Sequence, residues 1–164
     1  MHIINPTKER TLLDDIYPKT QIFIELAEFP DNEPSVIVTC CFPANDYYTS
    51  KPIPYVTTEN YVRCLSQASY LLAEHVLANH LSEVEASVET FKKAAADYEL
   101  YYRNLAMTFH ERVAKGQQFV LKLSIKNSRE IKRLGKDFIL FTFTNEKTVI
   151  SGEMSFVFIN PQGP

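Results

Sequence analysis

The sequence predicts an α+β fold in which a curved antiparallel sheet wraps around one central helix. Two strand-like segments precede a long, largely apolar helix, and three more strand-like segments close the chain. Short connections between the last three segments favour antiparallel pairing. An apolar helix placed between the two groups of strands has to be buried against the sheet that they form.

Five strands are predicted from runs rich in β-branched and aromatic residues. They are Gln21–Phe29, Ser35–Phe42, Gln118–Lys126, Asp137–Thr144 and Thr148–Ile159. The first two are predicted to form a hairpin, in which Ser35–Phe42 is the more central strand because it is apolar on both faces. Turns are predicted at 30–34, 127–136 and 144–147. Gly152, inside the last strand, indicates a bulge or the close approach of another backbone.

Helical spacing of apolar residues predicts the central helix, with Thr58 as its N-cap and Glu59 at its positive end. A short helical turn is predicted near Thr11–Tyr17. A second helical region is predicted from Glu83 to Lys115, with a break near Ala94–Asp97 and Gly116 as its stop. A curved sheet around a central helix, with an additional helical insertion, is the hotdog architecture; a generic α+β sandwich is the alternative.

Composition and charge indicate one globular domain spanning residues 1–164. Hydrophobic residues make up 45% of the chain and charged residues 23%, and the net charge of −3 comes without the basic stripe that nucleic-acid binding requires. No apolar stretch approaches the roughly 20 residues of a membrane span, and the first residues lack the apolar run of a signal peptide. With three cysteines and no zinc spacing, we expect a reduced, cytoplasmic protein without a metal or cofactor.

Several polar side chains lie on the predicted central helix. Ser66, Gln67 and Tyr70 could donate to a ligand carbonyl, or Ser66 could bond its own helix while Tyr70 spans an interface. Glu74 and His75 are adjacent, so their side chains diverge. His75 could be a buried core histidine, or it could be a catalytic base.

Tyrosines gather in two other places. Tyr47 and Tyr48 lie in the loop before the central helix, where each offers an apolar ring and one hydroxyl donor, and Tyr17 lies just before the first strand. The aromatic run over residues 98–109 has helical spacing, which is typical of a core or dimer interface and is compatible with an acyl tunnel. The usual nucleophile elbow, phosphate loop and HExxH motifs do not occur.

Four stretches together resemble the FcoT-type long-chain fatty acyl-CoA thioesterases. They are CLSQASYLLAEHVL after an aromatic loop, the terminal ISGEMSFVFINP, IYPK leading into a strand, and DYELYYRNL in the insertion. The resemblance covers most of the chain in the right order. It implies a hotdog fold, assembly as an oligomer, and action on long-chain acyl thioesters.

The resemblance also implies a site of two tyrosines and an asparagine. The tyrosine before the first strand corresponds to Tyr17, and the loop tyrosine to Tyr48, or to Tyr47 if the gap is placed differently. The asparagine falls on Ser66, so this chain departs from the family pattern there. A serine is shorter than an asparagine, so Ser66 would act through a water, or the substrate would lie differently, or hydrolysis would be weak.

The sequence thus predicts a thioesterase acting on long-chain acyl-CoA or acyl-carrier-protein thioesters. Tyr17 and Tyr48 would donate to the thioester carbonyl, Ser66 or Gln67 would hold the attacking water, and Tyr47, Glu59 and Tyr70 would contact the substrate. The acyl chain would lie between the central helix and segment 98–109.

Two alternatives stay open. One is addition to, or hydration of, an enoyl thioester, with Glu59 or His75 as base. The other is a non-catalytic module that binds acyl thioesters. In each case we expect at least a homodimer, because a single hotdog leaves much of its site open.

Overall fold

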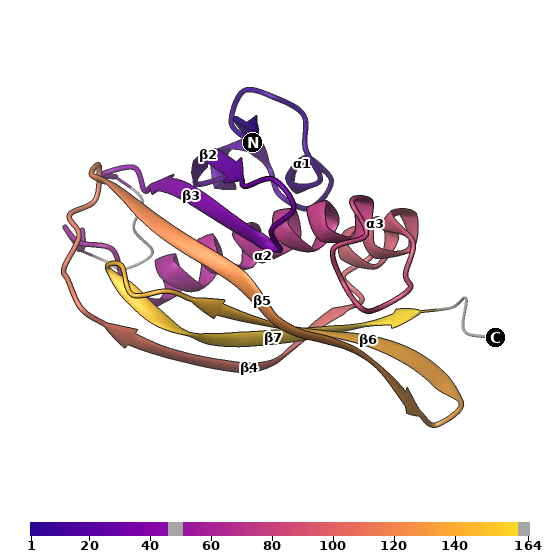
Figure 1. Ribbon diagram of the computed structural model, residues 1–164. Coiled ribbons are helices and arrows are strands. Elements are labelled where there is room, and N and C mark those ends of the chain that lie inside the picture. Colours follow the sequence, from indigo (N-terminus) through magenta and orange to yellow (C-terminus); the bar gives the residue numbers. More distant parts are fainter. Residues whose placement is uncertain (46–50, 161–164) are drawn as a thin grey trace.

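The computed structural model describes residues 1–45 and 51–160. A seven-stranded antiparallel sheet curves around one long helix, which confirms the predicted α+β class (Figure 1). In chain order the elements are β1 His2–Ile4, α1 Leu13–Ile16, a 3₁₀ turn Lys19–Gln21, β2 Ile24–Phe29, β3 Ser35–Cys41, α2 Thr58–Ala78, α3 Val88–Ala96, β4 Leu100–Phe109, β5 Gln118–Arg133, β6 Lys136–Asn145 and β7 Ile150–Asn160.

The strands lie in the order β1-β2-β3-β5-β6-β7-β4. The predicted hairpin of β2 and β3 is confirmed, as is the antiparallel pairing of β5, β6 and β7. Strand β3 pairs with β5 and so joins the two groups into one sheet. Strand β2 starts three residues later than predicted, because the chain first makes the 3₁₀ turn.

Helix α2 lies in the concave face of this sheet and is buried along most of its length. Ala68, Leu72 and Val76 are fully buried against inward-facing strand residues. Burying one such leucine contributes about 1.5–3 kcal/mol to folding. No described helix is long and apolar enough to cross a membrane.

The predicted helical region 83–115 is helical only over Val88–Ala96, so it is wrong at residues 83–87 and beyond Ala96. Helix α3 ends there, within the predicted break, and Tyr98 follows with a φ of 58°. Residues Leu100–Phe109 form strand β4, which pairs with β7 along its whole length. Backbone pairing along β7 overrides the helix propensity of this segment. Gly116 does not end a helix; with a φ of 83°, it lies in the turn before β5.

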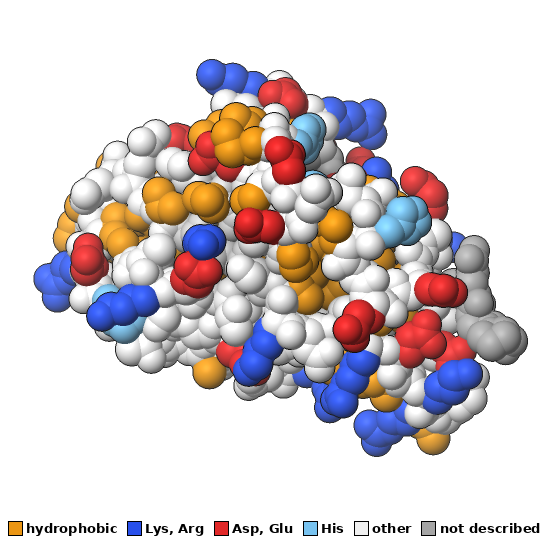
Figure 2. Space-filling view, in the orientation of Figure 1, with side chains coloured by type: hydrophobic (Ala, Val, Ile, Leu, Met, Phe, Trp, Pro, Cys, Tyr) orange, Lys and Arg blue, Asp and Glu red, His pale blue; other side chains and the backbone are white. Residues whose placement is uncertain are grey.

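Strand β5 is longer than predicted. Residues 127–133 were expected in a turn, yet they pair with β6, and only Leu134 and Gly135 remain unpaired between Arg133 and Lys136. The hairpin of β5 and β6 therefore projects beyond the body of the molecule (Figure 1). Lys and Arg side chains gather over its projecting end at the lower right of Figure 2.

Gly152 marks a close approach, as predicted. It pairs with Met107 of β4, and a Cβ at this position would lie 2.0 Å from the carbonyl oxygen of Ala106. The pairing of β4 and β7 is regular here, so the feature is a close contact and not a bulge.

Candidate functional site

A capping box fixes the amino-terminal end of α2. The cap is Thr57, one residue before the predicted Thr58. The backbone N–H of Thr57 donates a hydrogen bond to Asn60 Oδ1 at 3.0 Å. Glu59 follows in the first turn and is exposed to solvent, where it complements the positive end of the helix. Ser66 lies seven residues further on, about 10 Å along the axis. The fold therefore does not bring Glu59 to Ser66.

Three tyrosines from distant parts of the chain meet beside Ser66. We call Tyr17, Tyr70 and Tyr102 the tyrosine cluster. The ring centroids of Tyr17 and Tyr70 lie 6.4 Å apart, and those of Tyr70 and Tyr102 lie 6.5 Å apart. The side chains of Ser66, Ser69 and Tyr70 act on the pKa of Tyr102, and the Tyr70 hydroxyl acts on that of Tyr17, so these polar groups lie close to one another. Ser66 thus lies beside Tyr102, which in turn lies beside Tyr70.

The cluster lies where the sheet ends. Tyr17 follows α1, Tyr70 lies one helical turn after Ser66, and Tyr102 comes from the edge strand β4. Tyr70 is 7% exposed, whereas Tyr102 is 41% exposed because no described strand covers the outer side of β4. The cluster is therefore enclosed by the helix on one side and open at the sheet edge.

A bulge in β4 aims Tyr102 at the cluster. Tyr102 pairs with Phe156 and Asn104 with Ser155, so Arg103 is an extra residue between two pairs. The extra residue changes which positions of β4 face the helix. Before the bulge, the even-numbered Tyr102 faces α2. After the bulge, the odd-numbered Leu105 faces α2 and lines a cavity with Leu65. The bulge thus lets an aromatic hydroxyl and an apolar lining share one face of the strand.

The hydroxyls of the cluster hold their protons tightly. Burial raises the pKa of Tyr17 to about 12; the nearby Tyr102 adds to this rise, and the Tyr70 hydroxyl opposes it. Burial also raises the pKa of Tyr70, to which Tyr102 and Tyr17 add, and that of Tyr102. At neutral pH all three groups are protonated phenols, so they can donate hydrogen bonds but cannot accept a proton as bases.

Gln67 does not belong to this open site. Its side chain is buried, its Oε1 accepts from the backbone N–H of Phe23 at 3.0 Å, and its Nε2 donates to the carbonyl oxygen of Gln21 at 2.6 Å. Arg63, one turn earlier, stacks its guanidinium over the Phe23 ring at 4.3 Å. These contacts attach the segment before β2 to the helix, which is the structural role of a polar side chain on a buried helix.

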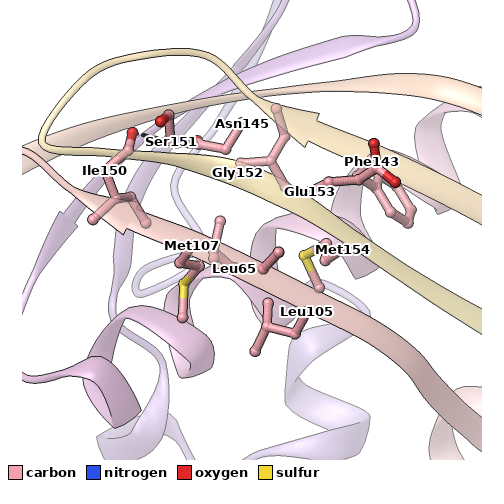
Figure 3. Close-up of a pocket in the computed structure, with 12 residues that line it drawn as sticks. Leu65, Leu105, Met107, Phe143, Asn145, Ile150, Ser151, Gly152, Glu153 and Met154 are labelled. Atoms are coloured by element: carbon pink, nitrogen blue, oxygen red, sulfur yellow. Dashed lines mark hydrogen bonds between the residues drawn. The ribbon is translucent and has the colours of Figure 1, made fainter.

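A narrow, mostly apolar cavity lies between α2, β4 and β7 (Figure 3), and no residue of the tyrosine cluster lines it. Leu65, Leu105, Met107 and Met154 line it, and its volume is about 10 Å³, no more than one water molecule needs. This is where the acyl chain was predicted to lie. In the single chain the space is closed, and an acyl chain would enter only if the flexible methionines and Leu105 moved aside.

His75 and Glu74 make their contacts with other parts of the chain than the tyrosine cluster. The His75 ring stacks on Phe29 at 4.4 Å, and its Nε2 is buried without a hydrogen-bond partner among the described residues. Burial lowers the pKa of His75, and the nearby His2 adds to this effect. Glu74 forms an ion pair with Lys92 at 2.9 Å. The alternative base His75 is thus neutral and packed against β2.

The fold therefore brings together three of the predicted site residues, Tyr17, Ser66 and Tyr70. Tyr47 and Tyr48 lie outside the described residues. Tyr102 was missed as a member of the site because its segment was assigned to a helix. A signal was present in the sequence: LYYRNLAMTF combines aromatic and apolar residues that fit a strand once one bulge is allowed.

The described residues contain no group of three or more His, Cys, Asp or Glu side chains arranged to hold a metal ion. The three thiols are free. Comparison with known proteins gives no family assignment, because no protein-family model matches the chain and no curated protein matches it.

Proposed function

We propose that the protein acts on acyl thioesters, as a thioesterase, with Ser66 and the tyrosine cluster as its site. The observation that carries the proposal is the meeting of Tyr17, Tyr70 and Tyr102 at an open edge of the sheet, with Ser66 next to Tyr102. Protonated phenols in a partly enclosed site are suited to stabilise negative charge on a carbonyl oxygen.

Hydrolysis needs few groups. Water adds to the thioester carbon, the carbonyl oxygen gains negative charge, and the C–S bond then breaks with its electrons going to sulfur. A thiol has a pKa near 8.5, so the thiolate can leave with little help from an acid. The departed thiolate then takes up the proton that the attacking water loses. The cluster would donate to the oxyanion, each well-placed donor being worth about 2.7–4 kcal/mol. Ser66 would hold the water, and the resemblance adds Tyr48 as a further donor.

Two observations bear on the alternatives. The Gln67 amide already makes hydrogen bonds to the backbone of Gln21 and Phe23. Ser66 is therefore the residue that we propose to hold the attacking water. Among the described residues, the groups that act on the cluster are hydroxyls and the Arg63 guanidinium. Addition to an enoyl thioester needs a base, so hydrolysis is the better-supported chemistry.

We further propose the hotdog architecture and a homo-oligomer. The curved sheet that encloses α2 supports the first. The second rests on β4, an edge strand whose inward-facing Leu105 and Phe109 are 40% and 47% exposed. A second copy paired along β4 would cover these side chains and close the open side of the tyrosine cluster.

The test uses saturated and 2-enoyl long-chain acyl-CoA thioesters, with and without glycine, and reads both free thiol and product mass. We expect thiol release from the saturated substrate, and a fall in kcat of about a hundredfold in Tyr70→Phe or Tyr102→Phe. Tyr101→Phe is the matched control, because Tyr101 precedes Tyr102 on the opposite face of β4 and should keep full activity.

Each other outcome contradicts a defined part of the proposal. Full activity of the Tyr70→Phe/Tyr102→Phe double variant would remove the cluster from the mechanism. A mass gain on the enoyl thioester without thiol release would indicate an addition enzyme. Tight binding without turnover would indicate a binding module.

A further inference from the structure

The projecting end of the β5–β6 hairpin carries different charges on its two faces. Successive side chains of a strand point to opposite faces. Ile139 and Phe141 are fully buried, so they mark the face toward the helices. Glu130 lies opposite Ile139, and Lys132 lies opposite Asp137, on this same face. The inner face of the hairpin end is therefore mixed in charge.

On the outer face of the hairpin end, every described charged side chain is a cation. Arg133 lies opposite Lys136, and two residues further along, Ile131 lies opposite Phe138. Arg129 follows on the same face. We call these five residues the basic face. Its three cations form no ion pair with any described residue, and the two apolar side chains between them are partly exposed. Figure 2 shows Lys and Arg side chains at this end of the molecule, with Asp and Glu side chains beside them.

The tip of the hairpin adds an exposed apolar side chain. Leu134 is 93% exposed and has a φ of 52°, followed by Gly135 with a φ of 70°. Such a turn favours Asn or Gly at the first position, and a leucine there costs folding energy. Leu134 extends the partly exposed apolar centre formed by Ile131 and Phe138, beside three cations that form no ion pair with a described residue.

We propose that the basic face docks an acidic protein that carries the acyl group as a thioester on a flexible arm, an acyl carrier protein. This inference rests on the proposed function, since it names the form in which the substrate arrives. The whole chain has a net charge of −3, so the cations of this face do not reflect the general composition. Cations around a small apolar centre complement an acidic, amphipathic partner surface.

A second copy of the chain is a poorer occupant of this face. In a two-fold interface the same patch meets itself. The three cations of the basic face would then oppose three cations of the partner, with no carboxylate on that face to separate them. Like-charge contacts of this kind cost several kcal/mol.

The position of the face suits delivery to the tyrosine cluster. Across the outer surface Arg129 pairs with Leu140, Leu140 with Val157, and Val157 with Tyr101. Three strand spacings amount to about 14 Å. Tyr102, the next residue of β4, faces the cluster. A flexible arm from a protein docked on the basic face would therefore pass around the edge of β4 to reach the site.

The experiment compares two charge reversals that are adjacent in the chain. Arg133→Glu changes the basic face, and Lys132→Glu changes the inner face by the same charge. The probe is a purified acyl carrier protein in its unloaded and acylated forms, with acyl-CoA of the same chain as the second substrate. Binding is read by fluorescence anisotropy at low and moderate salt, and kcat/KM is measured for both substrates.

We expect Arg133→Glu to weaken carrier-protein binding about tenfold and to lower kcat/KM for the acylated carrier by a similar factor. Hydrolysis of acyl-CoA should be unchanged in both variants, and Lys132→Glu should bind like the parent protein. Far-ultraviolet circular dichroism and a melting curve check that both variants are folded.

Several outcomes would overturn the inference. Absent carrier-protein binding alongside turnover of acyl-CoA would refute the docking and leave the proposed function standing. Equal losses in the two variants would show a general charge effect. If the parent binds anionic phospholipid vesicles instead of the carrier protein, and Arg133→Glu abolishes this, the face recognises a membrane surface. Carrier binding that depends on Arg133 without turnover of either substrate would refute the thioesterase and keep the docking.

Discussion

Gln67 illustrates how a single polar residue on a buried helix can be structural. Its amide satisfies one N–H and one C=O of the segment that leads into β2. We predict that Gln67→Leu lowers the free energy of unfolding by about 2–3 kcal/mol, because the Phe23 N–H becomes a buried donor without an acceptor. Urea denaturation followed by circular dichroism measures this change.

Gln118 offers the matched control for this prediction. Its side chain donates one hydrogen bond to Glu25 of β2, but at the exposed surface. Gln118→Leu should change the free energy of unfolding by less than about 0.5 kcal/mol. A Gln67→Leu protein as stable as the parent would show that water replaces the amide.

The tyrosines predict a specific dependence on alkaline pH. An unfolded tyrosine has a pKa near 10, whereas burial raises the pKa of Tyr17, and separately that of Tyr61, to about 12. The folded state holds these protons more tightly, so their contribution to stability is complete below pH 10 and is lost as the pH rises through 12.

Ultraviolet titration of tyrosinate measures this effect. Of the nine tyrosines, a group including Tyr17 should ionise only above about pH 11 in the folded protein, and Tyr17→Phe should make that late phase smaller. In guanidinium chloride all of them should ionise near pH 10. A single transition near pH 10 in the folded protein would contradict the burial of the cluster.

At the scale of elements, strand β4 explains why part of the fold could not be predicted from the sequence. Tyr98, Tyr102, Leu105 and Phe109 are spaced by four, three and four residues, which is the spacing of one helix face. In the structure the bulge at Arg103 produces the step of three within a strand. A local irregularity therefore imitated a helical period, and only the long-range pairing with β7 decides between the two.

Gly152 is the residue that most directly tests this pairing. Any side chain there would begin 2.0 Å from the Ala106 carbonyl oxygen, a backbone atom that cannot turn away. We predict that Gly152→Ala lowers the free energy of unfolding by about 1–3 kcal/mol, as overpacking does elsewhere, because β4 must move off β7. Chemical denaturation measures the loss.

Ser155→Ala, further along β7, serves as its control and should have a much smaller effect. If Gly152→Ala proved neutral, the backbones of β4 and β7 would not lie as close as the structure has them.

At the scale of the molecule, residues close in sequence were easier to predict than those that meet only in three dimensions. Ser66 and Tyr70 share a helix face, so their proximity followed from the period of the helix. Tyr17 was placed in the site only by the family resemblance, because no pattern along the chain connects the end of α1 to α2. Tyr102 required both the bulge and the pairing of β4 with β7, neither of which has a clear local signature.

The two edges of the sheet differ in a way that predicts how the molecule assembles. Strand β1 has three residues, whereas β4 has ten and carries exposed Leu105 and Phe109 on the side facing the helix. A long apolar edge is a template for pairing with another strand. We therefore predict a dimer or larger assembly through β4, to be measured by size-exclusion chromatography with light scattering at micromolar concentration.

Leu105→Lys should shift this assembly toward the monomer, because a lysine at an edge opposes strand pairing. Ile3→Lys is the matched control, since Ile3 is an exposed apolar residue of the opposite edge, at 47% exposure. Dissociation by Ile3→Lys instead would move the interface to β1. A monomeric parent protein at micromolar concentration would contradict assembly through β4 and would count against the hotdog architecture.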